Sequence, residues 1–476
     1  MGQIRVRHLS DVHGIARGAS SSAWRTQRRE SKHSAVPLQE LAELQAGHLE
    51  TQSWAALTSA AKRRLRINLM TTAVLKWAWN YAKYIFRFRA RFPTYKDLQN
   101  QGGREAPKES TAHRNGMIEM EGSTIALAGD WGSGTYSAYK VGDRIRTLKP
   151  DYTIHLGDVY YSGTGSEFDD YFLADGAWPR GKKGTFALNG NHEMYSGGRA
   201  YFSALKQKPL TYLIKGQNSV HQPQDFSYFC LQNEYWRILA IDTGYFAKSF
   251  PILELFDTYL IKLHIAIRTW LEEVVFKDPS DSRPVILLSH HEWFSAFDSE
   301  YKRMGKQIQP YLDRVLLWFW GHEHRFSGYA PFGFGDGPKV RARCIGHGGI
   351  PFDIAYPHEH RELVFSDERI NPESTNYVDA KQQLGYCGFA FLKFEGRKLT
   401  VSYYDERKDS DPLLKETWSW EEESGLWKGK VEGGSRLAKY KDGYSKVPPK
   451  RVVGDPAGED RLKELGGTWR WPQGST

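Results

Sequence analysis

Hydrophobic positions in the first quarter of the chain follow a helical pattern. From about residue 37 to residue 92 the pattern is helical, and Pro93 ends it; within this stretch, apolar residues between 67 and 88 recur at steps of three and four. Between residues 67 and 92 the basic positions fall on a separate face, which predicts an amphipathic helix. The apolar positions are Ile67, Met70, Val74, Trp77, Tyr81, Tyr84 and Phe88, and the polar ones are Lys76, Asn80, Lys83 and Arg87.

Two uses of this helix stay open. Its basic face suits an anionic membrane surface or a partner protein. The alternative is a helix that packs on its own catalytic domain and keeps its charges in solvent. In neither case does the helix cross a bilayer, because Lys76, Lys83 and Arg87 interrupt the most apolar stretch of the chain.

From residue 123 the pattern changes to short apolar runs separated by helical stretches, which is typical of an α/β domain. The longest of the helical stretches predicts a helix over residues 252–276. Strands are expected over residues 124–128, 152–156, 185–188, 237–241, 285–288, 316–320 and 340–345, followed by a hairpin of residues 389–394 and 399–404.

These changes of pattern divide the chain into three parts. Residues 1–120 form an N-terminal extension that ends in a polar linker, and residues 121–405 form the α/β domain. Residues 406–476 are polar, with tryptophans interspersed. We expect this C-terminal tail either to wrap the domain or to be partly disordered.

Charge separates the parts further. The 476 residues include 65 Lys+Arg and 56 Asp+Glu, a net charge of +9. Residues 1–120 carry 20 basic and 9 acidic residues, a net of +11, whereas residues 121–405 carry 31 and 34, a net of −3. The distribution argues against a basic channel for long nucleic acids in the α/β domain.

The cysteines and the N-terminus bear on the compartment. Cys230, Cys344 and Cys387 are an odd number, lie far apart and form no C-x-x-C pair, so a reducing environment is expected. No apolar run of secretory length follows the first residues. We therefore expect a cytoplasmic protein, with peripheral membrane attachment through the N-terminal helix left open.

Polar residues follow five of the predicted strands at their carboxyl ends. In open α/β sheets that edge is where ligands bind. Asp, Asn and His are oxygen and nitrogen donors that suit Fe, Mn or Zn, and two such ions can together stabilise a displacement at phosphorus. The five runs are Gly129-Asp130-Trp131-Gly132, Gly157-Asp158-Val159-Tyr160-Tyr161, Asn189-Gly190-Asn191-His192-Glu193, His290-His291 and Gly321-His322-Glu323-His324.

This order of motifs resembles the calcineurin-like metallophosphoesterase superfamily over residues 123–405. The family pattern runs D-x-H, G-D, G-N-H-D/E, H and G-H-x-H. The first motif departs from it, since Gly132 stands where most members have a metal-binding His. Purple acid phosphatases, one branch of the superfamily, also lack this His and read G-D-x-G followed by G-D-x-x-Y. In that branch a Tyr binds iron, and Tyr161 is the implied replacement here.

The resemblance implies a fold and a site. The fold is a four-layer α/β/β/α sandwich of two mixed β-sheets. The site holds two transition metal ions, Fe with Fe, Mn or Zn, and His192 protonates the leaving group. The first ion would be held by Asp130, Asp158, Tyr161 and His324, and the second by Asp158, Asn191, His290 and His322, with Asp158 as the bridge.

Several roles stay open at this point. Tyr161 is a ligand or a packed aromatic, and His291 is an alternative to His290. Glu193 is expected as a hydrogen-bond acceptor behind the ligands rather than as a ligand. Two further residues, Arg325 and His347, either face the phosphate or have ordinary loop roles. An alternative source of the missing ligand is His13, in a D-x-H run far upstream of the domain.

The expected activity is hydrolysis of a phosphate ester by a hydroxide that bridges the two ions. The substrate is a small phosphoester, a nucleotide or a phosphoprotein. One alternative is a phosphodiesterase or nuclease of the same superfamily that grips nucleic acid with the basic N-terminal region. Another is a non-catalytic scaffold on this fold, which the nearly complete ligand set disfavours.

Overall fold

The structure is a computed structural model of the chain. It describes residues 89–100, 115–207, 210–216, 221–247, 261–298, 300–350, 354, 357, 362–375, 383–408, 411–441, 450–452 and 462–470. His13 and residues 67–88 of the predicted N-terminal helix lie outside these ranges. Residues 89–92 are described and are not helical, and the first described helix is α6, Tyr95–Asn100.

Two ten-stranded mixed sheets form the centre of the molecule. The first has the order β1 (Met117–Glu119), β7 (Phe229–Gln232), β8 (Arg237–Ala240), β9 (Val285–Ser289), β10 (Val315–Trp320), β12 (Val340–Ile345), β11 (Phe326–Phe332), β13 (Leu363–Ser366), β20 (Ala438–Lys441) and β21 (Lys450–Val452). Strands β8, β9, β10 and β12 are parallel neighbours.

The second sheet has a parallel centre, β2–β3–β4, and antiparallel strands on both sides of it. Its order is β22 (Gly467–Trp469), β19 (Leu426–Gly433), β18 (Leu414–Glu421), β17 (Lys398–Asp405), β16 (Gly388–Phe394), β2 (Thr124–Ala128), β3 (Tyr152–His155), β4 (Gly184–Ala187), β5 (Thr211–Leu213) and β6 (His221–Pro223). A separate pair is formed by β14 (Ile370–Thr375) and β15 (Gln383–Gly385).

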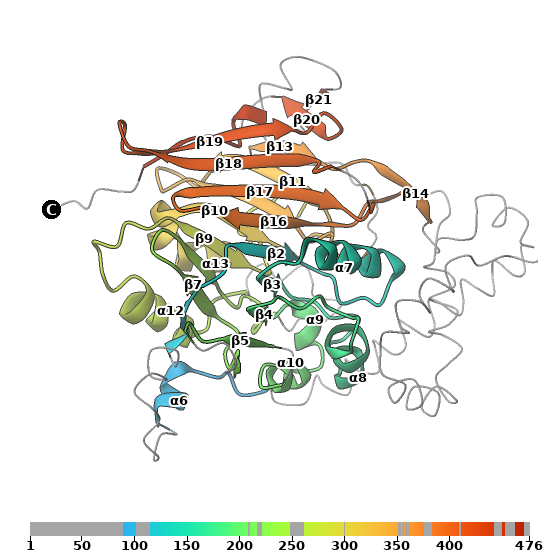
Figure 1. Ribbon diagram of the computed structural model, residues 1–476, viewed down its shortest axis with the longest axis vertical. Coiled ribbons are helices and arrows are strands. Elements are labelled where there is room, and N and C mark those ends of the chain that lie inside the picture. Colours follow the sequence, from blue (N-terminus) through green and yellow to red (C-terminus); the bar gives the residue numbers. More distant parts are fainter. Residues whose placement is uncertain are drawn as a thin grey trace, which may run out of the picture.

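Helices lie outside the strands, as Figure 1 shows for the teal and green helices on one side and the olive helices on the other. They are α7 (Tyr136–Leu148), α8 (Gly165–Phe168), α9 (Asn191–Met194), α10 (Arg199–Ala204), α12 (Ile265–Trp270) and α13 (Lys302–Ile308). π-Helical turns Asp169–Leu173 and Leu271–Val275 extend α8 and α12, and a 3₁₀ turn, Gln309–Arg314, extends α13.

Alternate side chains of the central strands enter two different hydrophobic clusters. On β2, Ile125 and Leu127 belong to the cluster that both sheets share, whereas Ala126 and Ala128 belong to a second cluster, which also contains residues of α7. The two faces of a strand alternate with a period of two, so a strand that is buried on both faces reads as one continuous apolar run. This arrangement confirms the α/β sandwich of two mixed sheets.

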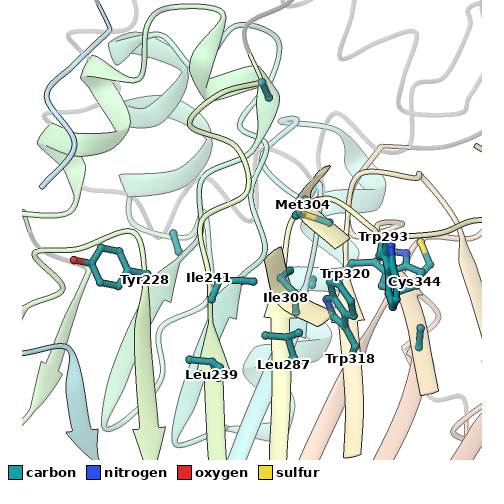
Figure 2. Packing of buried hydrophobic residues seen from close by; sticks show 14 of the residues in the cluster. Tyr228, Leu239, Ile241, Leu287, Trp293, Met304, Ile308, Trp318, Trp320 and Cys344 are labelled. Carbon is teal, nitrogen blue, oxygen red and sulfur yellow. The ribbon is translucent and has the colours of Figure 1, made fainter. Parts of the chain in front are cut away.

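Large aromatic residues fill the layer between the first sheet and its helices. Met304 and Ile308 of α13 lie over Trp318 and Trp320 of β10 in the same cluster (Figure 2). Trp318 is fully buried and donates from its indole N–H to the Ser289 hydroxyl at 2.8 Å. The layer therefore fixes β10, which carries two of the predicted metal ligands at its carboxyl end.

Most strands lie where the apolar runs predict them, but two predicted elements differ. The helix expected over residues 252–276 begins, within its described part, only at Ile265, because the ring of His264 accepts a hydrogen bond from the Ala266 N–H and caps α12 there. After residue 405 the chain adds β18 and β19 to the second sheet.

The division of the chain into domains at residues 120 and 405 stays a prediction. None of the described helices is long and apolar enough to cross a membrane.

Candidate metal centre

The site lies where the two sheets come together at the ends of β2, β3, β4, β9 and β10. A Cβ atom added at Gly129, after β2, would lie 2.8 Å from the Cα of Gly321, after β10. One added at Gly190 would lie 2.1 Å from Oδ1 of Asp158. Glycine is therefore required at both positions: at Gly129 because loops of the two sheets approach each other, and at Gly190 because the loops after β3 and β4 do.

Three of the predicted ligands have left-handed backbone conformations. The φ angles are 60° at Asp130, 74° at Asp158 and 63° at His322. Such angles are uncommon outside glycine and mark positions that the surrounding structure holds in place. Each of the three side chains contacts a loop that follows a strand of the other sheet, and Asp130 and Asp158 are almost completely buried.

One group of donors gathers around Asp130. The hydroxyl of Tyr160 lies 2.8 Å from Oδ1 of Asp130, 3.3 Å from Oδ2 of Asp158 and 2.7 Å from Nε2 of His324. His324 Nε2 is itself 3.5 Å from Oδ1 of Asp130. Two carboxylates, a phenol and an imidazole thus share one small volume.

A second group gathers around Asn191. Its Oδ1 lies 2.9 Å from Nε2 of His290 and 3.1 Å from Nδ1 of His322. Oδ2 of Asp158 is 3.4 Å from Nε2 of His290, so Asp158 faces both groups. Atoms of Asp130, Asp158 and His290 also lie within 4.8 Å of one another.

His291 and Tyr161, the two residues whose roles the sequence leaves open, have other contacts. His291 hydrogen-bonds the hydroxyl of Thr243 through Nδ1 at 3.1 Å, although one of its nitrogens also lies close to His290 and His322. Tyr161 is held by its backbone, since its N–H donates to Glu167 Oε1 at 2.6 Å. The phenol that the structure places between the two aspartates is that of Tyr160.

Tyr160 is not among the residues predicted from the sequence, although its hydroxyl lies among the donors. The family spacing counts to the third residue after the aspartate, which is Tyr161, and the signal that could have pointed to Tyr160 was only that a second tyrosine is adjacent. Which tyrosine side chain enters the site depends on the turn after Asp158, and a sequence motif does not specify that turn.

His192 lies at the edge of both groups. Its Nδ1 hydrogen-bonds the carbonyl of Tyr161 at 2.8 Å, and its backbone N–H donates to Oδ1 of Asp158 at 3.0 Å. Nε2 of His192 is 3.8 Å from Oδ2 of Asp158, and the side chain is 20% exposed. The ring is therefore oriented by the Tyr161 carbonyl and is still accessible to a molecule that enters the site.

Glu193 supports the loops without lying among the donors. Its carboxyl group accepts backbone N–H groups of Asp158 at 3.1 Å, Val159 at 2.8 Å and Gly190 at 2.8 Å. It joins the loops after β3 and β4, as an acceptor behind the ligands would. Burial and the charge of Asp158 raise the pKa of Glu193 to about 8.

The other two candidates have local contacts. Arg325 pairs with Glu323 at 3.2 Å, and its guanidinium lies 3.9 Å from the ring centroid of Phe297. His347 is buried and stacks on Phe326 at 5.3 Å between ring centroids. These contacts are consistent with ordinary structural roles for Arg325 and His347 in their loops.

Burial and neighbouring charges set the protonation of the donors while no ion is bound. Burial opposes ionisation of Asp158, but the nearby His290 and His192 hold its pKa well below the usual range. Burial also works against the charge on His290, yet Asp158 raises the pKa of His290 to about 9. Burial and the charge of His290 lower the pKa of His322 to about 3, so the ring is neutral, and its Nε2 lies 3.0 Å from the Tyr301 hydroxyl. Carboxylates, an amide oxygen and neutral imidazole are the donors that borderline transition metal ions take, so the residues fit the two ions that the family implies.

Comparisons with solved structures give low similarities. Purple acid phosphatase PPD1 from yellow lupin (Lupinus luteus) shows 15% identity and a TM-score of 0.39, and the match covers 62% of this chain and 53% of that one, about half its length. A dimetal phosphatase from Danio rerio shows 11% identity and a TM-score of 0.34, covering 60% of this chain and 97% of that one. The structure of PhoD shows 12% identity and a TM-score of 0.38, covering 73% and 76%.

The family comparison is more direct. No curated protein matches the chain. Residues 123–326 match the model of the family described as calcineurin-like phosphoesterase, and these residues include all of the donors described above. The match indicates a hydrolase that acts on phosphoesters, and metal dependence is implied by the family. Over residues 123–326 it confirms the resemblance that the motifs predicted.

Proposed function

We propose that this chain is a phosphatase that hydrolyses a phosphate ester with two metal ions. The observation that carries the proposal is the place of Asp158, whose carboxylate faces a phenol–carboxylate–imidazole group on one side and an amide–imidazole group on the other. A carboxylate between two donor groups is the arrangement that a pair of adjacent ions requires.

The donors divide into two sets. Asp130, Asp158, Tyr160 and His324 would hold the first ion, and Asp158, Asn191, His290 and His322 the second. Tyr160 replaces Tyr161 in this assignment because its hydroxyl is the one within hydrogen-bond distance of Asp130. Burial and the charges of Asp130 and Asp158 hold the pKa of Tyr160 well above its usual range, so the phenol stays protonated until a cation is bound.

The ions, when bound, supply Lewis-acid polarisation of a phosphoryl oxygen and activation of water. The protein residues do the rest. Asp158 fixes the separation of the two donor sets. His192 is held by the Tyr161 carbonyl through Nδ1, which leaves Nε2 directed toward the site, and in its protonated form it can give this proton to the departing oxygen.

The test begins with metal content and paired substrates. We expect purified protein to hold two transition metal ions per chain and to hydrolyse p-nitrophenyl phosphate in preference to bis-(p-nitrophenyl) phosphate. Asp158→Asn should lower kcat/KM by at least about 100-fold and reduce the bound metal, since it weakens the residue common to both sets. Fewer than one tightly bound ion, or full activity in Asp158→Asn, would refute the proposal. Faster hydrolysis of the diester, with steep salt dependence on DNA, would favour the phosphodiesterase alternative.

Visible absorption spectroscopy can show which of the two tyrosines, Tyr160 or Tyr161, binds the first ion. A phenolate bound to ferric iron gives a visible charge-transfer band. In iron-loaded protein we expect Tyr160→Phe to abolish this band and Tyr161→Phe, its matched control, to retain it. The opposite result would return the ligand to Tyr161, and no band in the wild type would argue against iron in the first set.

A further inference from the structure

The side-chain amide of Asn191 can serve a metal ion in only one orientation. Its Oδ1 is a donor to cations, whereas its NH₂ group is not. In the structure Oδ1 faces the two imidazoles of the second set, at 2.9 Å from His290 Nε2 and 3.1 Å from His322 Nδ1. The NH₂ group therefore points the other way and needs an acceptor of its own.

The hydroxyl of Tyr195 is that acceptor. Nδ2 of Asn191 donates to it at 3.2 Å. Tyr195 follows Asn191 by four residues and directly follows α9, so its side chain lies on the same face of the turn. Its own backbone N–H donates to the carbonyls of Asn191 and His192, at 3.2 Å each, which fixes the place from which the ring extends.

Contacts of the ring hold the hydroxyl in place. Tyr195 is 8% exposed, and its ring meets the ring of His192 edge-on with 4.9 Å between the centroids. A hydroxyl on a nearly buried ring has few other positions. It is therefore a pre-formed acceptor for the Asn191 amide rather than an occasional partner.

We propose that Tyr195 is a positioning residue for the second metal ion. Its hydroxyl accepts a hydrogen bond from the NH₂ group of Asn191 and so stabilises the orientation in which Oδ1 faces the ion. Without the hydroxyl, that same orientation leaves a half-buried donor without a partner. The free-energy cost of this unpaired donor lowers the affinity of the second set for its ion. The inference rests on the proposed function, since it takes Asn191 as a ligand.

The expected loss is confined to one ion. Partners behind a metal ligand typically change metal affinity by about 10–100-fold when they are removed. Tyr195→Phe keeps the ring and its contact with His192 and removes only the hydroxyl. We expect it to weaken the second ion by this factor and to leave the first ion, bound by Asp130 and Tyr160, unchanged.

The experiment measures the two ions separately. In protein whose first set holds ferric iron, the second ion is titrated as Zn²⁺ or Mn²⁺ against a competing chelator, and the first set is followed by the tyrosinate–iron band. In Tyr195→Phe the second dissociation constant should rise about 10–100-fold while the band persists. The loss of activity should be reversed by excess metal, because the hydroxyl acts on affinity and not on the reaction.

Tyr201→Phe is the matched control. The Tyr201 hydroxyl is buried and donates to the carbonyl of Ala187 at 3.0 Å, away from the metal ligands. This variant should lose some stability and keep both dissociation constants. If Tyr195→Phe binds the second ion as tightly as the wild type does, weakens both ions equally, or stays inactive at saturating metal, the role assigned to Tyr195 is wrong. A wild type that holds fewer than one tightly bound ion per chain would instead refute the proposed function, and the inference with it.

Discussion

His155 supports the turn that carries Asp130. Its Nε2 accepts the backbone N–H of Trp131 at 3.2 Å, and its ring packs against Phe172 and Trp178, with centroids 5.0 and 5.1 Å away. The residue is almost fully buried, and burial lowers its pKa to about 3. The ring is therefore neutral in the folded protein over most of the acidic range, which keeps Nε2 available as an acceptor.

This neutral state predicts a loss of stability in acid. Below about pH 6.5 the unfolded chain protonates this histidine, whereas the folded chain does so only near pH 3. The contribution of His155 to the free energy of unfolding is thus complete above pH 6.5 and falls by about 1.4 kcal/mol for each unit of pH below it. Urea unfolding of metal-stripped protein between pH 6 and pH 4 should show a shallower pH dependence in His155→Phe than in the wild type. Equal slopes would mean that the buried ring takes up a proton with little penalty.

Residue types at the candidate site can be predicted from the sequence, but side-chain directions cannot. Asp130, Asp158, Asn191, His290, His322 and His324 follow apolar strands, and strands that end at one edge bring their next residues together. The direction of Tyr160 and Tyr161 depends on how the loop turns after the left-handed Asp158. The contact between Tyr195 and Asn191 depends likewise on the four-residue step through α9, which no metal motif contains.

Strand β18 shows why the strands after residue 405 are hard to predict from the sequence. Its residues alternate between buried and half-exposed, and one inward position is Glu416, which is completely buried. When the solvent-facing positions of a strand are polar and one of its buried positions is charged, the sequence lacks an apolar run and is interpreted as a polar tail. The strands β2, β3 and β9 are buried on both faces and read as apolar runs, so they were predicted within a residue or two.

Glu416 is tolerated because Arg343 of β12 lies opposite. The guanidinium donates from Nε to Oε1 at 2.6 Å and from Nη2 to Oε2 at 2.7 Å, and the Tyr403 hydroxyl adds a bond of 2.7 Å to Oε1. Both charged side chains have no solvent exposure. The pair joins the two sheets across the interior.

We predict that removing one member of this pair destabilises the protein strongly. Glu416→Leu leaves a buried guanidinium without its counter-charge and should lower the free energy of unfolding by about 3–5 kcal/mol. Arg343→Met combined with Glu416→Leu should recover much of that loss, because no charge is then left buried. Urea unfolding of the single and double variants provides the comparison. A single variant that loses less than the double one would show that the hydrogen bonds, and not the unpaired charge, determine the effect.

At the scale of the whole molecule, the C-terminal region is part of the sandwich. Arg343 also donates to the carbonyl of Leu465 at 3.1 Å, and Arg341 donates to those of Gly466 at 3.0 Å and Thr468 at 3.1 Å. Strand β22 pairs with β19 at the edge of the second sheet. The resemblance to a known family predicted two mixed sheets, but it ended at residue 405 and so did not include these strands.

A chain that ends at residue 405 should therefore not fold as an independent domain. It would lack β18, β19 and β22, would expose the edge of β17 along its whole length and would leave Arg343 buried without Glu416. We expect this truncation to be insoluble or to lack a cooperative thermal transition, while a chain that ends at residue 470 keeps the Tm and the metal content of the full chain. Co-expression with a separate fragment of residues 406–476 should restore solubility if strand pairing is the missing element. A stable, metal-loaded protein that ends at residue 405 would instead contradict this prediction and show that the C-terminal strands are an accessory layer.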